Sequence, residues 1–267
     1  MRAPELLPGI VFQMWEDVPP TASGCFGIGF CTAGRRMYHL RGDCIALAPE
    51  QLLLYQSSMR TAPPTPLTGR EQGCMLLVDI RRLAPSLMEA FCGDAADSLQ
   101  RLTADNDFVV LASERLTEIM QTMIQDESSR RLKCMELLLV LETAEQITPQ
   151  ICTEQEFHIA VSAAEFALSQ PQEHFTVRSL AAFSDVSQTR FKDCFARVYG
   201  MPVYRFLRTQ KMHLAAELLR TTDRRVIDIA CELGYDNPSK FARAFTEVMG
   251  MTPSACRSSD HLEHSGG

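Results

Sequence analysis

The sequence predicts an α+β fold of two domains, in which a β-rich amino-terminal domain with following helices precedes an all-helical carboxyl-terminal domain. Three observations support this prediction. Short strand-like segments with frequent turn signals fill residues 1–80, helical periodicity replaces them from Leu83 onward, and a pattern of two short helices occurs twice between residues 176 and 257. We place the domains at residues 1–150 and 151–258, followed by a polar tail at 259–267 that we expect to be disordered.

The strand-like segments lie at residues 9–15, 25–31, 37–40, 44–47, 52–56 and 74–80. Residues 32–35 are typical of a hairpin turn, and residues 41–43 form a second turn signal. The segment 61–66 is too rich in proline for a helix. Short strands with frequent turns predict a small barrel or a sandwich.

Helical periodicity covers residues 83–146. It contains three apolar stripes, formed by Leu87, Met88 and Phe91, by Leu116, Ile119, Met120, Met123 and Ile124, and by Leu132, Met135, Leu138, Leu139 and Leu141 together with Glu136. Such stripes either pack in the core or contact a second copy of the chain, and the sequence leaves both alternatives open. Pro149 ends the pattern and predicts the break between the domains at residues 147–150.

The second copy of the helix pair has the clearer signals. Val226, Ile229, Ala230 and Leu233 follow the spacing of one apolar helix face. Gly234 is suited to end that helix, and Pro238 is suited to the first turn of the next one. This next helix would bury Phe241, Ala244, Phe245 and Val248. Together these signals predict two short helices joined by a tight turn, which is a helix-turn-helix motif.

The first copy lies 50 residues upstream, counted from Phe191 to Phe241. Leu180-Ala181 corresponds to Ile229-Ala230, Phe195 to Phe245, and Gly200 to Gly250. Ser187 is placed to cap the second helix of this copy. Between the two copies, residues 203–220 predict one long helix, which would hold the two helix pairs at a fixed separation.

With these motifs, residues from about 158 to 257 resemble the DNA-binding domain of AraC/XylS-type transcription regulators. The resemblance is carried by Leu180-Ala181, Ser187, Phe191 and Phe195; Tyr204, Arg208, Ala215 and residues 217–219; Ile227, Ile229-Ala230 and Gly234-Tyr235-Asp236; Ser239, Phe241 and Arg243-Ala244-Phe245; and Gly250 with Thr252-Pro253. It implies two recognition helices in successive major-groove segments, about 34 Å apart. It also implies a cupin-like amino-terminal barrel that senses a small molecule.

The resemblance assigns the base contacts to Gln188, Thr189, Lys192 and Asp193 in the first copy and to Ser239, Lys240 and Arg243 in the second. Arg243 and Lys240 could donate to guanine, Gln188 could pair with adenine, and Asp193 could accept from cytosine. Asp193 departs from the family pattern, which more often has a basic or neutral polar residue there. Phosphate contacts are expected from Arg197, Arg205, Arg208 and Lys211. The alternative for all of these residues is a solvated helix surface.

The charge distribution supports a nucleic-acid partner. Residues 174–257 contain 13 Lys and Arg against 8 Asp and Glu, a net charge of +5, whereas the whole chain carries −7. A basic segment in an otherwise acidic chain is typical of phosphate binding. We therefore expect Arg243→Ala to relax the preference for one or two base pairs, and Arg208→Ala to weaken binding to all sequences alike.

The sequence contains no pattern that predicts catalysis, a metal or a cofactor. The six histidines show no H-x-x-x-H spacing, and the ten cysteines form no C-x-x-C pair. His39 is isolated among the amino-terminal strands, so we expect it to be a packing or surface residue. The cysteines are expected to be reduced and buried, as in a cytoplasmic protein. No signal peptide or membrane span is predicted.

We interpret the chain as a cytoplasmic, sequence-specific DNA-binding transcription regulator and not an enzyme. The expected partners are double-stranded DNA, RNA polymerase, a small-molecule effector and a second copy of the chain. Two alternatives stay open. The regulator could be controlled by protein–protein contact without any small-molecule ligand, or the amino-terminal domain could be an enzyme fused to a DNA-binding module.

Overall fold

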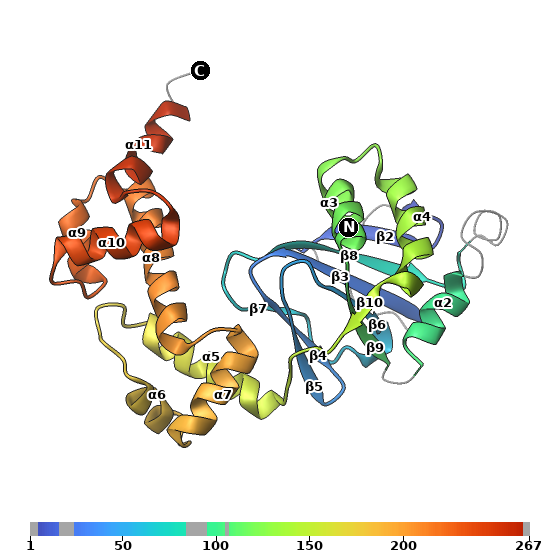
Figure 1. The fold of residues 1–267 in the computed structure, drawn as a ribbon, viewed down its shortest axis with the longest axis horizontal. Helices are drawn as coiled ribbons and strands as arrows, with labels where there is room; N and C mark the ends of the chain where they lie inside the picture. Colours follow the sequence, from blue (N-terminus) through green and yellow to red (C-terminus); the bar gives the residue numbers. More distant parts are fainter. Residues whose placement is uncertain (1–4, 16–23, 84–94, 105–106, 264–267) are drawn as a thin grey trace. The chain divides into compact units, whose positions relative to one another are not determined.

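The computed structural model describes residues 5–15, 24–83, 95–104 and 107–263. The chain divides into two compact units, unit 1 at residues 1–154 and unit 2 at residues 155–267. Unit 1 is rich in strands and unit 2 is helical (Figure 1), which confirms the predicted fold class at this level. None of the described helices combines the length and the apolar character that crossing a membrane requires.

Unit 1 contains two antiparallel sheets. The larger has the strand order β1-β2-β8-β3-β6-β9-β10, and the smaller has the order β11-β5-β4-β7. Their bounds are β1 Glu5–Leu7, β2 Ile10–Met14, β3 Cys25–Ala33, β4 Arg36–Leu40, β5 Asp43–Leu47, β6 Leu52–Gln56, β7 Thr65–Pro66, β8 Gln72–Asp79, β9 Phe108–Ala112, β10 Glu145–Ile147 and β11 Ile151–Cys152. Each sheet has open edges, so the described strands do not form the closed barrel that we predicted.

The turn at residues 32–35 explains why two sheets form. We predicted a hairpin there, and this prediction is wrong, because β3 pairs with β6 and β8 whereas β4 pairs with β5 and β7. Gly34 has a φ of 74°, and the pairing of β3 with β8 becomes irregular after Cys31. The chain therefore leaves one sheet at this turn and enters the other. The second turn, at residues 41–43, does join a hairpin, β4 with β5.

The central strands are buried on both faces, because each face packs against a different layer. Leu52 and Leu54 of β6 belong to the core beneath the helices, whereas Leu53 and Tyr55 belong to the core between the sheets. Gly27 and Gly29 of β3 leave room for the rings of Tyr55 and Tyr38, since a Cβ atom on either glycine would lie within 2.3 Å of one of these side chains. The two tyrosine rings meet edge to face, 5.7 Å apart.

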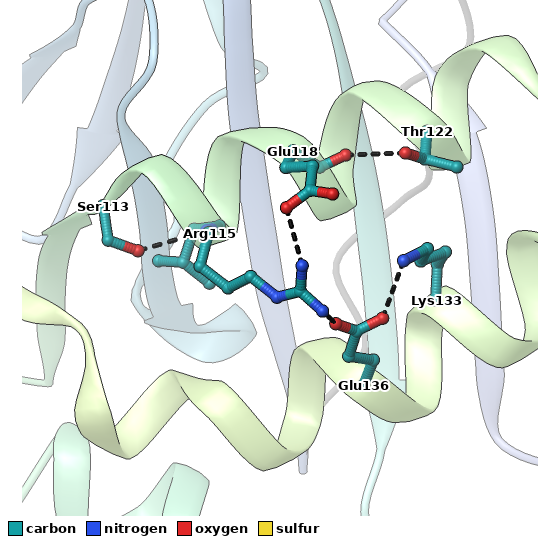
Figure 2. A network of polar contacts seen from close by, with 7 residues as sticks. Ser113, Arg115, Glu118, Thr122, Lys133 and Glu136 are labelled. Carbon is teal, nitrogen blue, oxygen red and sulfur yellow. Dashed lines mark hydrogen bonds and ion pairs between the residues drawn. The ribbon is translucent and has the colours of Figure 1, made fainter.

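Helices α2 (Ala95–Leu102), α3 (Glu114–Gln125) and α4 (Arg130–Val140) come after β8 in sequence, with β9 between α2 and α3 and β10 after α4. Leu116, Ile119, Met120 and Met123 of α3 are buried against that sheet, as their spacing predicted. Figure 2 shows the polar contacts between α3 and α4: Arg115 pairs with both Glu118 and Glu136, and Lys133 lies 2.8 Å from Glu136. The predicted stripe of Leu87, Met88 and Phe91 lies outside the described residues.

The helical prediction for residues 83–146 missed two strands. β9 and β10 pair with each other and extend the large sheet beyond β6. The short apolar run Phe108-Val109-Val110-Leu111 is too brief for its period to distinguish a buried strand from a buried helix. β11 continues past the predicted break at 147–150 and pairs with β5.

Unit 2 consists of helices. They are α5 Glu154–Leu168, α6 Val177–Phe183, α7 Gln188–Tyr199, α8 Val203–Thr221, α9 Val226–Glu232, α10 Pro238–Met249 and α11 Pro253–Glu263. The tail that we predicted to be disordered from residue 259 is helical as far as Glu263, and residues 264–267 lie outside the described residues. Cys256 of α11 belongs to the same buried cluster as Phe241 and Phe245, which anchors this last helix.

Candidate nucleic-acid interface

Helices α7 and α10 match each other in length and in the way they begin and end. Each has twelve residues, and the second starts 50 residues after the first. Ser187 caps α7 by accepting a hydrogen bond from the Arg190 amide. Asn237 caps α10 through the amides of Ser239 and Lys240, at 2.9 and 3.2 Å. Gly200 and Gly250 end the two helices in the left-handed conformation.

The same side of each helix is buried. Phe191 and Phe195 of α7 and Phe241 and Phe245 of α10 are inaccessible to solvent, as predicted for the core. Helix α8 contributes to both cores, because Phe206 contacts Phe195 whereas Met212, Ala215 and Leu219 pack in the cluster with Phe241. One continuous helix therefore supports both helix pairs.

The opposite side of each helix is exposed, and it carries every residue for which we predicted a base contact. On α7 these are Gln188, Thr189, Lys192 and Asp193, and on α10 they are Ser239, Lys240 and Arg243. All seven lie in the first half of their helices, the half that reads base edges when a helix enters the major groove. None of the described residues forms an ion pair with Lys192 or Lys240.

Glu247, which was not among the predicted site residues, partly neutralises the positive charge on the exposed side of α10. Its carboxylate pairs with Arg208 of α8 and accepts a hydrogen bond of 2.8 Å from Nε of Arg243. The hydrogen bonds from Arg208 and then Arg243 lower the pKa of Glu247, so this side chain is ionised at neutral pH. The side chain of Arg243 is nevertheless 83% exposed. The spacing of four residues between Arg243 and Glu247 places both side chains on one face of a helix, and this spacing could have predicted their ion pair.

The four expected phosphate contacts lie in different surroundings. Arg205 is exposed and makes no ion pair with any described residue, whereas Arg197 pairs with Glu156 of α5 at 2.7 Å. Arg208 is partly buried beside Glu247. Nζ of Lys211 donates to the carbonyls of Glu173 and Leu233, both at 3.2 Å, and burial lowers the pKa of this lysine. Lys211 therefore holds the end of α9 in place, and of the four only Arg205 is exposed without an ion pair to a described residue.

Unit 1 contains a second cluster of polar side chains, which the sequence did not predict. Nδ1 of His39 lies 3.0 Å from a carboxylate oxygen of Glu154 and 3.5 Å from Sγ of Cys44. Contact with Cys152, followed by burial, raises the pKa of the Cys44 thiol. His39 is thus not isolated, contrary to our expectation, and a nitrogen, a sulfur and an oxygen donor lie within 4.8 Å of one another. Only the pairing of the strands brings these residues together.

Comparisons with known proteins agree on the carboxyl-terminal unit. A family model described as a helix-turn-helix domain matches residues 180–259. An uncharacterized HTH-type transcriptional regulator of Haemophilus influenzae is 26% identical over 250 residues, which cover 86% of this chain and 83% of that protein. The HTH-type transcriptional activator AarP of Providencia stuartii is 33% identical over 81 residues, which cover 30% of this chain and 60% of AarP.

One solved structure with a similar sequence contains DNA. It is the DNA-binding domain of AdpA, a global transcriptional factor, in complex with a target DNA. That domain is 28% identical, with a TM-score of 0.38, and the match covers 40% of this chain and 97% of that one. Over residues 180–259 the chain matches a helix-turn-helix family, and in this it resembles AraC/XylS-type transcription regulators.

Proposed function

We propose that this protein binds duplex DNA with two recognition helices, α7 and α10, which enter two successive major-groove segments. The correspondence of the two helices at a distance of 50 residues supports this proposal, because both are capped, both bury a pair of phenylalanines and both expose polar residues at their amino-terminal halves. In this arrangement the bases are contacted by the exposed residues at the amino-terminal halves of the two helices, which are Gln188, Thr189, Lys192, Asp193, Ser239, Lys240 and Arg243. Arg205 and Arg197 face phosphates.

The two kinds of contact can be separated by substitution. Arg243→Ala removes a base contact and should relax the preference for one or two base pairs, at about 1–3 kcal/mol of discrimination. Arg205→Ala removes a phosphate contact and should weaken binding to every sequence alike, while reducing the salt slope by about one. The measurement is selection of binding sites from a random duplex library, followed by salt titration on the selected site.

Arg131→Ala is the matched control, because Arg131 is an exposed arginine of α4 in unit 1. It should change neither sequence preference nor salt slope. If Arg243→Ala and Arg205→Ala give the same pattern, α10 is not the helix that distinguishes the bases.

We also propose that the protein activates transcription through contact with RNA polymerase. AarP, which is 33% identical over 81 residues, is named a transcriptional activator, and so is RhaR of Pectobacterium carotovorum, which is 29% identical over 117 residues. A promoter fused to the selected binding site should respond to the protein with increased transcript in a reconstituted system. A decrease in transcript would instead identify a repressor.

Unit 1 is proposed to control this activity by binding a small-molecule effector between its sheets. The hydroxyl of Tyr38 and the indole nitrogen of Trp15 are buried in the core between the sheets and have no hydrogen-bond partner among the described residues. A polar ligand group that hydrogen-bonds to these two atoms would gain binding free energy, which a purely apolar core would not provide. Control by protein contact alone is the competing proposal, and a thermal-shift screen of the full chain with sugars and aromatic acids distinguishes the two.

A second copy of the chain is the proposed partner for α4. Leu132 and Leu139 lie seven residues apart on this helix and are 68% and 51% exposed, whereas Leu138 and Leu141 are buried. The structure therefore divides the predicted stripe between core and surface. Leu139→Arg should leave the fold intact and increase the fraction of monomer in sedimentation velocity, while the exposed Arg131→Ala should not.

A further inference from the structure

The strand pairing of the small sheet places three potential metal ligands side by side. His39 of β4 lies opposite Cys44 of β5, and Cys44 lies opposite Cys152 of β11. Tyr38, Leu40 and Ile45 belong to the core between the sheets. Because side chains alternate along a strand, His39 and Cys44 lie on the other face. Glu154 follows Cys152 by two residues and extends the row.

The donor atoms of His39, Cys44 and Glu154 lie within 4.8 Å of one another, and Cys152 contacts Cys44. Three of the four side chains are buried. Nδ1 of His39 lies 3.0 Å from Oε1 of Glu154 and 3.5 Å from Sγ of Cys44. His39, Cys44 and Cys152 are each at most 5% exposed, whereas the carboxylate of Glu154 is 46% exposed. A solvated ion can therefore approach these four side chains from the side of Glu154.

We propose that His39, Cys44, Cys152 and Glu154 bind a divalent transition-metal ion of the zinc class. Imidazole, thiolate and carboxylate are the ligands of tetrahedral Zn²⁺. With Zn–S of about 2.3 Å and Zn–N of about 2.0 Å, two ligands of a tetrahedral ion lie roughly 3.5 Å apart. The Cys44–His39 separation already has this value, and the His39–Glu154 separation requires only a small opening.

Thr65 supplies the contact that orients the imidazole. Nε2 of His39 lies 2.9 Å from the hydroxyl of Thr65 on β7. When Nε2 carries the proton and donates it to this hydroxyl, Nδ1 presents a lone pair toward Cys44 and Glu154. Ligating histidines are commonly fixed in this way by a partner on the other ring nitrogen.

The ion would stabilise the last strand of unit 1. β11 has only two residues, and it is attached to β5 by a short ladder at the edge of the small sheet. Two of the four ligands, Cys152 and Glu154, come from this strand and the residues directly after it. Binding of the ion would therefore hold β11 on the sheet and couple metal availability to the segment that enters α5.

The test uses the full chain, freed of metal by a chelator under reducing conditions, with Zn²⁺ and Co²⁺ as the probes. The chain should retain about one Zn²⁺ after gel filtration, and Co²⁺ should give the intense visible bands and the thiolate charge-transfer band of a tetrahedral sulfur-containing site. Glu154→Gln and Cys152→Ser should each lower Zn²⁺ affinity at least about tenfold, and Thr65→Val should lower it by about tenfold. Amide exchange of β11 should slow when Zn²⁺ is added.

Cys231→Ser is the matched control, because Cys231 is an exposed thiol of α9 outside the row. It should retain both the ion and the spectrum. Glu154→Gln keeps the shape of a half-exposed side chain, so circular dichroism should confirm that it folds. The proposal is overturned if Zn²⁺ is not retained, if Co²⁺ shows no thiolate band, if Cys231→Ser loses as much affinity as Cys152→Ser, or if Cys44 and Cys152 form a disulfide while Zn²⁺ is present.

Discussion

Glu247 reduces the positive charge on the exposed side of α10, the side that we propose to face DNA. It pairs with Arg243, which we propose to contact a base, and with Arg208, for which we expected a phosphate contact. Two cations thus share one carboxylate on the exposed side of the helix. Each arginine can bind a phosphate or a base only when it gives up its ion pair with Glu247.

Glu247→Gln should therefore strengthen DNA binding. Removal of the carboxylate leaves Arg208 to neutralise phosphate charge and takes a negative charge away from the exposed side of α10, so we expect tighter binding to all sequences and a salt slope steeper by about one. The measurement is a salt titration of the dissociation constant. Glu217→Gln, at an exposed position of α8, is the control for the change in net charge. Weaker specific binding with unchanged nonspecific binding would show that Glu247 orients Arg243.

The same pair predicts a dependence on pH. The arginines lower the pKa of Glu247 in the folded state, so its contribution to stability is present at neutral pH and is lost as the pH falls through that lowered pKa. Wild type and Glu247→Gln should thus differ in thermal stability near neutral pH and converge in acid. A difference that persists at low pH would assign the effect to another group.

At the scale of the helices, the left-handed glycines are not equivalent. Gly250 ends α10 with a φ of 72°, and a Cβ atom there would have no neighbour within 4 Å. Gly234 has a φ of 81° in the turn after α9, and a Cβ atom there would lie 2.5 Å from the carbonyl oxygen of Gln172. Of these two glycines, only Gly234 combines a left-handed conformation with a close approach of the backbone.

Substitution of each glycine by alanine should separate these two effects. Gly250→Ala should destabilise unit 2 by about 1–2 kcal/mol, which is the cost of a left-handed conformation for a residue with a Cβ atom. Gly234→Ala should be worse by at least about 1 kcal/mol, because the backbone near Gln172 must also move. Urea unfolding of both variants measures the difference. Equal losses would mean that the turn adjusts without strain.

The sequence predicted those elements whose signals are local. Ser187 caps the start of α7, Pro238 is the first residue of α10, and Gly200 and Gly250 cap the ends of the two helices. These starts and ends depend on backbone geometry that neighbouring residues determine. β9 was missed because a short apolar run has no distinctive period. The hairpin at residues 32–35 was wrong because the partner of β3 is chosen by sheet packing, which the turn does not encode.

The same distinction applies to the sites. The exposure of the seven proposed base-contacting residues follows from helical spacing and was predictable. The pairing of Arg208 with Glu247 joins residues 39 positions apart, and that of His39 with Glu154 joins residues 115 positions apart. Contacts of this kind depend on tertiary packing, so a single sequence contains no signal for them.

For the whole molecule, α8 would set the spacing of the two DNA segments that the proposed recognition helices reach. Its 19 residues form an unbroken helix of about 28 Å, and both helix pairs pack against it. Neither pair can therefore move far relative to the other within unit 2. A rigid connection of this kind fixes the distance between two reading helices, whereas a flexible linker would tolerate variable spacing.

Insertion of base pairs between the two segments of the selected site tests this rigidity. Five additional base pairs place the second segment on the opposite side of the duplex, so only one helix can engage and affinity should fall to that of a single segment. Ten additional base pairs restore the side but add about 34 Å, which α8 cannot span, so affinity should not recover. Gel-shift titration measures both, with the same insertions outside the footprint as controls. Recovery at ten base pairs would show that the two helix pairs separate when DNA is bound.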